Sequence, residues 1–229
     1  MALKLNRSFA ILYGIMLGDG CLSLTSRNKK IVFIAGSLKD DIPFFENIIK
    51  PIIKKQINKD ISIKYRYKIG CINLFFSSVK LYDYISNLGY PIGKKGDKLF
   101  IPQVFYDKKL VKYVLQGFFA TDGSLVLTDN NGTLYPRVEA NGIAKKLIEE
   151  ISVYLNSTGI KCNLYLAKRK VYSGYPNPQE QFRIQINGKD NLKKFIKSIG
   201  FINPKHLESL NHYYKKVAPP RIELGTSAL

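Results

Sequence analysis

Two aspartates follow similar apolar segments, and each precedes a glycine. Asp19 stands at the end of LYGIMLGDG, and Asp122 stands at the end of LQGFFATDG. If both segments are helices that pack on each other, the two carboxylates meet at the helix C-termini and repel each other. A divalent cation relieves that repulsion, and carboxylates completed by carbonyls, water and a substrate phosphate suit Mg²⁺ better than zinc. The chemistry that fits is metal-assisted attack of water on a phosphodiester.

The residues before each aspartate favour close helix packing. Small residues recur four positions apart, Gly14 and Gly18 in the first segment and Gly117 and Thr121 in the second. Residues with this spacing lie on one face of a helix, so another backbone can come close there. Gly18 and Thr121 directly precede the aspartates, and they are the further candidate ligands of the metal.

The chain is internally duplicated. A shift of 122 − 19 = 103 residues superimposes the two Asp-Gly segments, and NLGYPIGK matches SIGFINPK further on. Each copy predicts a helix up to Asp-Gly, two strands, an amphipathic helix, a hairpin and a last helix. After its first helix, the first copy is predicted as strands near 21–26 and 31–36, a helix over 40–56, a hairpin over 60–77 and a helix over 78–89. The second copy continues with a helix over 144–159, a hairpin over 160–187 and a helix over 189–200. The fold class is α+β, with the order αββαββα present twice.

The segment YPIGKKGDKLFIPQ between the copies is rich in Gly, Pro and Lys and has the composition of a linker. We expect an N-terminal repeat over residues 1–100, with the linker starting near 89, and a C-terminal repeat over 101–217. The Pro-interrupted end, residues 218–229, is expected to be a disordered tail.

The charge of the chain points to a polyanionic partner. Lys and Arg number 36 against 17 Asp and Glu, which gives a net charge of +19. Nucleic acid is the first expectation. An anionic membrane is disfavoured, because no apolar run approaches the roughly 18 to 20 residues that span a bilayer.

The N-terminal segment has the pattern of a secretory signal, but its recurrence at residue 115 indicates structure and not a leader. Three cysteines without a C-x-x-C spacing and only two histidines make a zinc site improbable. We expect an intracellular protein that is not secreted, with an organelle as an open alternative.

Two strands carry the residues expected to contact DNA. In ISIKYRYKI, Ser62, Lys64, Arg66 and Lys68 alternate with Ile61, Ile63, Tyr65, Tyr67 and Ile69, which are expected to face the core. In QFRIQIN, Gln181, Arg183, Gln185 and Asn187 alternate with Phe182, Ile184 and Ile186. Residues 61–76 and 161–179 contain no acid, as close approach to phosphate requires. Asn73 is added as a contact on the following strand, with Lys168, Arg169 and Lys170 at the rim.

These segments together resemble the paired motifs of the LAGLIDADG homing endonucleases, in the single-chain form with two pseudo-symmetric repeats. The resemblance covers residues 7 to 216, and it implies two curved antiparallel sheets that saddle double-stranded DNA. It also implies a monomer, encoded by an intron, that makes a staggered double-strand break in a long asymmetric target. Mg²⁺ is the implied cofactor, and Mn²⁺ or Ca²⁺ would occupy the same sites.

The resemblance also assigns residues. The last acidic residue of each motif binds metal in the family, which here means Asp19 and Asp122. The first acidic position of the motif, which packs in the family, is occupied by Leu17 and Ala120. Many relatives place a catalytic lysine after the last helix of each repeat, which here means Lys94 or Lys95 in the first repeat and Lys205 in the second. We take Lys95 and Lys205 as the candidates.

Three other functions stay open at this point. A catalytically silent relative would bind DNA as a regulator, and an intron maturase would use the same surface for structured RNA. A basic protein that binds ribosomal RNA would need the charge but not the duplicated carboxylates. The retention of both aspartates favours the nuclease.

Overall fold

The computed structural model of the chain describes residues 3–168 and 180–217. The predicted disordered tail, residues 218–229, therefore lies outside the described residues. The first repeat consists of α1 (Arg7–Asp19), β1 (Gly20–Leu24), β2 (Lys30–Ser37), α2 (Ile42–Phe44), the π-helical turn Phe45–Ile49, α3 (Lys50–Ile57), β3 (Ile63–Arg66), the 3₁₀ turn Tyr67–Ile69, β4 (Cys71–Ser77) and α4 (Val79–Asn87).

The second repeat has the same order of elements. It consists of α5 (Gln103–Asp107), α6 (Val111–Thr121), β5 (Gly123–Asn130), β6 (Thr133–Gly142), α7 (Lys145–Ser157), β7 (Asn163–Lys168), β8 (Glu180–Asn187), α8 (Lys189–Ser198) and α9 (Pro204–Val217). The predicted αββαββα order is confirmed in both copies. The short α5 and the longer α9 are additions that the sequence analysis did not predict.

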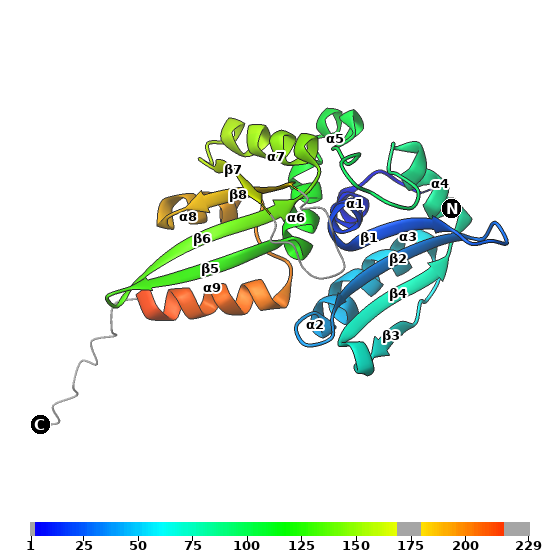
Figure 1. Cartoon of the computed structure of the whole chain (residues 1–229), viewed down its shortest axis with the longest axis horizontal. Helices are drawn as coiled ribbons and strands as arrows, with labels where there is room; N and C mark the ends of the chain where they lie inside the picture. The colour runs from blue at the N-terminus through cyan, green and yellow to red at the C-terminus, as the bar shows by residue number, and fades with distance from the viewer. Residues whose placement is uncertain (1–2, 169–179, 218–229) are drawn as a thin grey trace, which may run out of the picture.

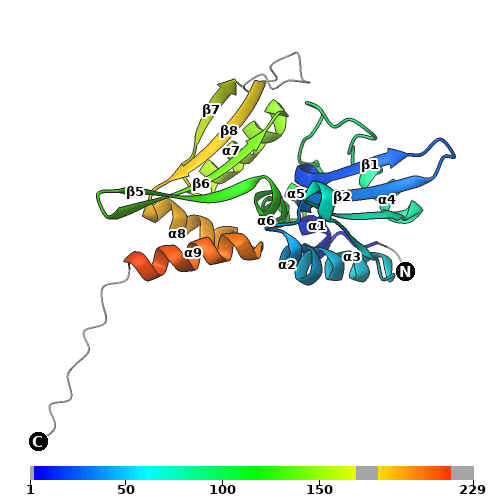
Figure 2. The same ribbon diagram turned by 60° about the horizontal axis from the view of Figure 1, so that its bottom comes forward.

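Each repeat contains one four-stranded antiparallel sheet. The strand orders are β1-β2-β4-β3 and β5-β6-β8-β7, so the two sheets have equivalent topology. The sheets lie on either side of the α1–α6 pair (Figures 1 and 2). In Figure 2, α2 and α3 lie below the first sheet, and α8 and α9 lie below the second. Helices thus cover one face of each sheet and leave the other for a ligand.

The pair α1 and α6 forms the centre of the molecule, and its contact depends on two glycines. A methyl group at Gly14 would overlap the carbonyl oxygen of Val114, and one at Gly117 would overlap the carbonyl oxygen of Ile11. The two backbones therefore touch, as the spacing of small residues predicted. Glycine costs about 1 kcal/mol of helix stability relative to alanine, and this close approach is what it permits.

The predicted amphipathic helix over 40–56 is present but is not a uniform α-helix. Its middle, Phe45–Ile49, is a π-helical turn that ends two residues before Pro51. A proline ring clashes with the carbonyl four residues earlier in an α-helix, and a wider turn relieves that clash. The helices α4 and α8 stop where predicted, because Gly89 and Gly200 adopt φ values of 89° and 75°.

The prediction of one alternating strand over 61–69 is wrong in its second half. β3 ends at Arg66, and the chain turns through a 3₁₀ turn and Gly70, which has a φ of 61°. Tyr67 and Ile69, expected in the core, are 77% and 69% exposed. The chain must reverse to pair β3 with β4, and a left-handed glycine closes that reversal.

The segment between the repeats packs on both of them. The Tyr90 hydroxyl donates to the carbonyl oxygens of Met16 at 2.6 Å and Gly20 at 2.9 Å. Further on, the Ile101 amide donates to the Glu150 carboxylate at 2.7 Å. The basic end of this segment is thereby fixed beside the α1 C-terminus. Within the described residues, no helix is long and apolar enough to cross a membrane.

Candidate active site

Asp19 and Asp122 occupy equivalent places at the ends of the central helices. Asp19 is the last residue of α1, Asp122 caps α6, and each is followed at once by the first strand of its sheet. The Asp122 carboxylate is close to α1, because a methyl group at Gly18 would lie 3.3 Å from its Oδ2 atom. The contact between α1 and α6 therefore brings the two acidic helix ends together.

The surroundings of both carboxylates disfavour their charge. Burial raises the pKa of Asp19 to about 6, against the attraction of Lys95, and Asp41 adds to the increase. Burial, followed by the charge of Asp19, raises the pKa of Asp122 to about 7, again against Lys95. Two half-buried carboxylates that repel each other suit a divalent cation, since the cation favours their ionised forms.

The cation would need further oxygen ligands. Within residues 3–168 and 180–217 no group of three or more His, Cys, Asp and Glu side chains is placed to hold a metal. Gly18 and Thr121 are the two further predicted ligands. The Gly18 carbonyl already accepts a hydrogen bond from the Lys95 ammonium. The Thr121 hydroxyl donates within α6, to the Phe118 carbonyl at 2.9 Å. A carbonyl oxygen has two lone pairs, so the Gly18 carbonyl retains capacity for a cation.

Lys95 lies at the site and Lys94 does not. The Lys95 ammonium donates to the carbonyl oxygens of Gly18 and, at 3.2 Å, Leu17, while the Lys94 side chain is exposed. Burial lowers the pKa of Lys95, although the charges of Asp122 and Asp19 oppose that shift. Lys95 therefore provides a positive charge beside both aspartates.

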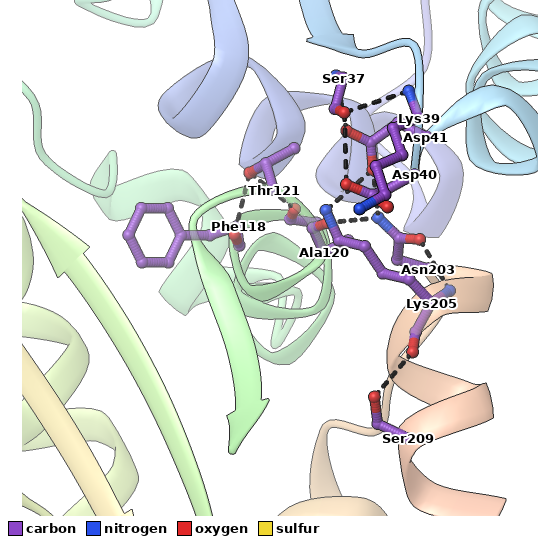
Figure 3. A network of polar contacts seen from close by, with 11 residues as sticks. Ser37, Lys39, Asp40, Asp41, Phe118, Ala120, Thr121, Asn203, Lys205 and Ser209 are labelled. Carbon is purple, nitrogen blue, oxygen red and sulfur yellow. Dashed lines mark hydrogen bonds and ion pairs between the residues drawn. The ribbon is translucent and has the colours of Figure 1, made fainter.

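Lys205 approaches the site from the second repeat and is held by a carboxylate. Its ammonium donates to Asp41 Oδ1 at 2.9 Å, in the turn between β2 and α2 (Figure 3). Asp41 is only 6% exposed. It also accepts hydrogen bonds from the backbone amide of Ser37 at 2.9 Å and from the side-chain amide of Asn203 at 3.2 Å. Burial alone would raise the pKa of Asp41, but these hydrogen bonds outweigh it and lower the pKa.

A small cavity beside Asp122 adds residues that the sequence analysis did not assign. Its volume is about 210 Å³, and its lining includes Gly18, Lys95, Asp122, Asn141 and Gln181. Asn141 donates its backbone amide to the Asp122 carbonyl at 3.4 Å and accepts from Arg183 Nε at 2.8 Å. Asn141 lies near the end of β6, and the sequence analysis did not assign it.

The first sheet holds only part of the predicted DNA-contacting set on its open face. Lys64 and Arg66 are exposed, and their register opposite Asn73 and Cys71 puts them on one face. Asn73 is only 2% exposed, although its register with Lys64 places it on the same face of the sheet, and its prediction as a DNA contact stays untested. Ser62 precedes β3 and Lys68 lies in the 3₁₀ turn, so both are exposed but off the strand.

The second sheet shows the predicted alternation. Ile184 and Ile186 are buried, while Gln181, Arg183, Gln185 and Asn187 alternate with them along β8. Lys168 ends β7, and its side chain, together with Arg169 and Lys170, lies outside the described residues. The prediction of a rim contact there therefore stays untested.

An acid lies on the same face as the polar residues of β8. Glu139, on the neighbouring β6, is 7% exposed and pairs in register with Gln185, whose amide donates to its Oε1 at 2.9 Å. Arg137 forms an ion pair with the same carboxylate. The sequence argument considered only acids within residues 161–179. It therefore missed Glu139, which belongs to another strand of the same sheet.

The sequence of the chain matches one protein-family model and several known proteins. Residues 109–200 match the model of a LAGLIDADG-like domain. The chain is 31% identical over 217 residues to a probable translation initiation factor IF-2 of Methanocaldococcus jannaschii, covering 93% of the chain but 17% of the relative. It is 26% identical to a replication factor C small subunit of the same organism, covering 93% of the chain and 10% of the relative. The chain thus spans less than a fifth of the length of either protein.

Solved structures match across both repeats. The crystal structure of I-DmoI in complex with DNA and calcium has a TM-score of 0.61 at 20% identity, covering 90% of this chain and 97% of the other. The homing endonuclease I-WcaI bound to its DNA recognition sequence also has a TM-score of 0.61, at 15% identity, covering 92% and 88%. The chain therefore contains a LAGLIDADG-like domain at residues 109–200 and has, over both repeats, the LAGLIDADG fold of these homing endonucleases.

Proposed function

We propose that the protein is a site-specific, divalent-metal-dependent DNA endonuclease that makes a staggered double-strand break in a long asymmetric target. The observation that carries this proposal is the meeting of Asp19 and Asp122 at the ends of α1 and α6, between two sheets. A fold that served only for binding would gain nothing from two half-buried carboxylates whose surroundings raise the cost of their ionisation. With a cation, the same arrangement becomes favourable.

The residues of the site divide the work. Asp19 and Asp122 would hold the divalent cation, which when bound neutralises charge on the scissile phosphate and makes water a better nucleophile. Lys95 and Lys205 supply positive charge beside the aspartates, for the phosphate and its developing negative charge. Asn141 offers a polar group beside Asp122, in the cavity that also contains Gln181.

The sheets would hold the duplex. Lys64 and Arg66 on the first sheet, and Gln181, Arg183 and Gln185 on the second, are spaced along strands that lie on either side of the site. Arg and Gln can form bidentate hydrogen bonds with guanine and adenine in the major groove. The two faces carry different side chains, so the proposed target is asymmetric. One chain carries both repeats, so a monomer suffices.

The similar proteins support the fold on which this proposal rests. They give less support for the identity of the binding partner. Related structures were solved as I-DmoI with DNA and manganese and as I-SmaMI bound to an uncleaved DNA target with calcium ions. The initiation and replication factors have unrelated roles, and the chain matches only a small part of each. The shared segment is thus a unit separable from both roles, and neither role is carried over to this chain.

The test is cleavage of a library of randomised duplexes in Mg²⁺, with sequencing of the broken ends. We expect a family of related sites cut with a constant stagger. Asp19→Asn and Asp122→Asn should each abolish the break, while binding in Ca²⁺ changes less than about threefold. Asp107→Asn, at an exposed residue of α5, is the matched control.

The rival functions give different results in the same assay. A silent DNA-binding regulator would retain selected sequences without cutting them. A maturase or a ribosomal-RNA-binding protein would prefer folded RNA to duplex DNA under competition. No contact in the described residues favours RNA over DNA. Absence of cleavage in Mg²⁺ and in Mn²⁺ would contradict the nuclease proposal.

A further inference from the structure

The two candidate lysines that follow α4 and α8, Lys95 and Lys205, are held in different ways, although the residue that aligns with Lys205 is Lys94. Lys95 donates to carbonyl oxygens of Leu17 and Gly18, at the end of the central helix of its own repeat. Lys205 instead donates to the carboxylate of Asp41, which belongs to the other repeat. The pseudo-symmetry of the fold is therefore broken at the site itself.

Asp41 is built into the contact between the repeats. Its Oδ2 atom accepts from the Ser37 amide, and its Oδ1 atom accepts from both Lys205 and Asn203 (Figure 3). The Asn203 amide also donates to the Ala120 carbonyl at 2.9 Å, two residues before Asp122. One buried carboxylate thus connects the β2–α2 turn with the ends of α6 and α9.

The second repeat offers no counterpart to Asp41. Register pairs Gly20 with Ile34 and Gly123 with Ala140, so a shift of 140 − 34 = 106 residues places Leu147 at the position of Asp41. Alignment of the helix caps places Ala144 there instead. Both residues are apolar and buried, so neither can hold a lysine.

The ion pair orients Lys205 without using up its donors. Within the described residues the ammonium has one acceptor, Asp41, which leaves two of its three N–H groups for a phosphate. Its charge also acts on Asp19, whose pKa it lowers. The Asp41 carboxylate removes much of the conformational freedom of a long side chain that would otherwise need ordering at each turnover.

We infer that Asp41 is a positioning residue for Lys205 and that it serves the cleavage of one DNA strand only. This inference rests on the proposed nuclease function. It adds that the two DNA strands are cleaved with the help of different residues. The strand that depends on Lys205 should need Asp41, and the strand that depends on Lys95 should not.

The test uses a duplex recovered from the library selection, labelled at each 5′ end with a different dye, and follows both strands. Asp41→Asn keeps the size of the side chain but removes its charge. We expect it to slow one strand at least tenfold and the other less than twofold, so that a nicked duplex accumulates. Lys205→Met should slow the same strand, and Lys95→Met the opposite strand. Asp40→Asn, at the exposed neighbour, should leave both rates unchanged.

A double variant separates positioning from a general loss of structure. Asp41→Asn combined with Lys205→Met should be no slower than Lys205→Met alone, since both remove one interaction. If Asp41→Asn does not fold, Asp41→Glu retains the charge, moves the carboxylate by one methylene, and should slow the same strand. Equal slowing of both strands, or multiplied effects in the double variant, would overturn the inference alone. Failure of the unaltered protein to cut any duplex would overturn the proposed function and the inference together.

Discussion

At the residue scale, Asp19 and Asp122 make the stability of the fold depend on pH. Their pKa values in the folded protein, about 6 and about 7, lie above the value of 3.8 that an ordinary aspartate has. Between pH 4 and 7 the unfolded chain therefore binds fewer protons than the folded one, so stability falls as pH rises. The aspartates are retained at a cost to the fold, which is typical of functional groups.

We predict that Asp122→Asn is more stable than the unaltered protein at pH 8, by roughly 2 kcal/mol, because the uncharged amide avoids the ionisation that burial disfavours. The difference should be much smaller at pH 4, close to the ordinary aspartate value of 3.8, where the folded chain carries a protonated Asp122 and a large part of the unfolded chains does too. Urea denaturation at the two pH values measures it, with Asp107→Asn as the control.

Magnesium gives the matching check on the same residue. At pH 8, Mg²⁺ should raise the unfolding midpoint of the unaltered protein more than that of Asp122→Asn, since binding to the folded state alone stabilises it. An equal effect of Mg²⁺ on both proteins would show that the cation does not bind at the paired aspartates.

At the element scale, the contact between α1 and α6 sets the separation of the two carboxylates. We predict that Gly117→Ala destabilises the protein by about 1 to 3 kcal/mol, because its methyl group would overlap the backbone of α1 and push the helices apart. The same shift should reduce cleavage. Thermal unfolding and the cleavage rate measure the two effects.

Gly142→Ala is the matched control for that prediction. A methyl group there would meet only the Cδ1 and Cγ1 atoms of the Ile148 side chain, at 3.0 and 3.2 Å, and a side chain can move where a backbone cannot. If Gly142→Ala and Gly117→Ala lose the same stability, backbone contact is not what requires the glycine in α6.

The same two helices explain how much could be predicted from the sequence. The duplicated small residues and Asp-Gly ends identify α1, α6 and the aspartates, because close packing leaves a local pattern. The Asp41–Lys205 pair could not be predicted, since it joins residues 164 positions apart and Asp41 has no counterpart in the other copy. Glu139 was missed for a related reason: sheet neighbours come from the pairing of strands, and a count along one hairpin does not include them.

The open face of the second sheet leads to a prediction about sequence preference. Arg183 is held through Nε by Asn141, which leaves the end of its guanidinium group for a base. Arg183→Ala should relax the preference at one or two base pairs and cost about 1 to 3 kcal/mol of binding on the selected target. Gln185→Ala should relax neighbouring positions.

Profiling of each variant against all single-base changes of the target is the measurement. Lys205→Met should lower the cleavage rate without changing which bases are preferred. If Arg183→Ala weakened every sequence equally, the side chain would contact phosphate and not a base edge, and the assignment of β8 as a reading strand would be incorrect.

At the scale of the whole molecule, the fold is shared with chains of low sequence identity. Identity to the I-DmoI structure is 20%, although the two chains share both repeats and both sheets. The core positions need only apolar residues of suitable size and the backbone contact at the glycines. The strand faces are free to vary, and with them the target, so no base sequence follows from the relatives.

The net charge of +19 gives the last prediction, which concerns affinity as a function of salt. If binding is driven by the release of counterions from phosphates, affinity for the selected duplex should fall on the order of 10³-fold or more between ~50 and ~200 mM salt. If only the open faces of the sheets meet the duplex, as proposed, the basic residues should not contribute equally to the salt dependence. Arg66→Ala, on the first sheet, should reduce the slope of log affinity against log salt by about 1. Lys193→Ala, on the exposed side of α8 below the second sheet, should leave the slope unchanged. A flat salt dependence would contradict the interpretation that the positive charge serves to bind nucleic acid. Equal slopes for the two variants would contradict the proposal that the sheets, and not the helices, face the DNA.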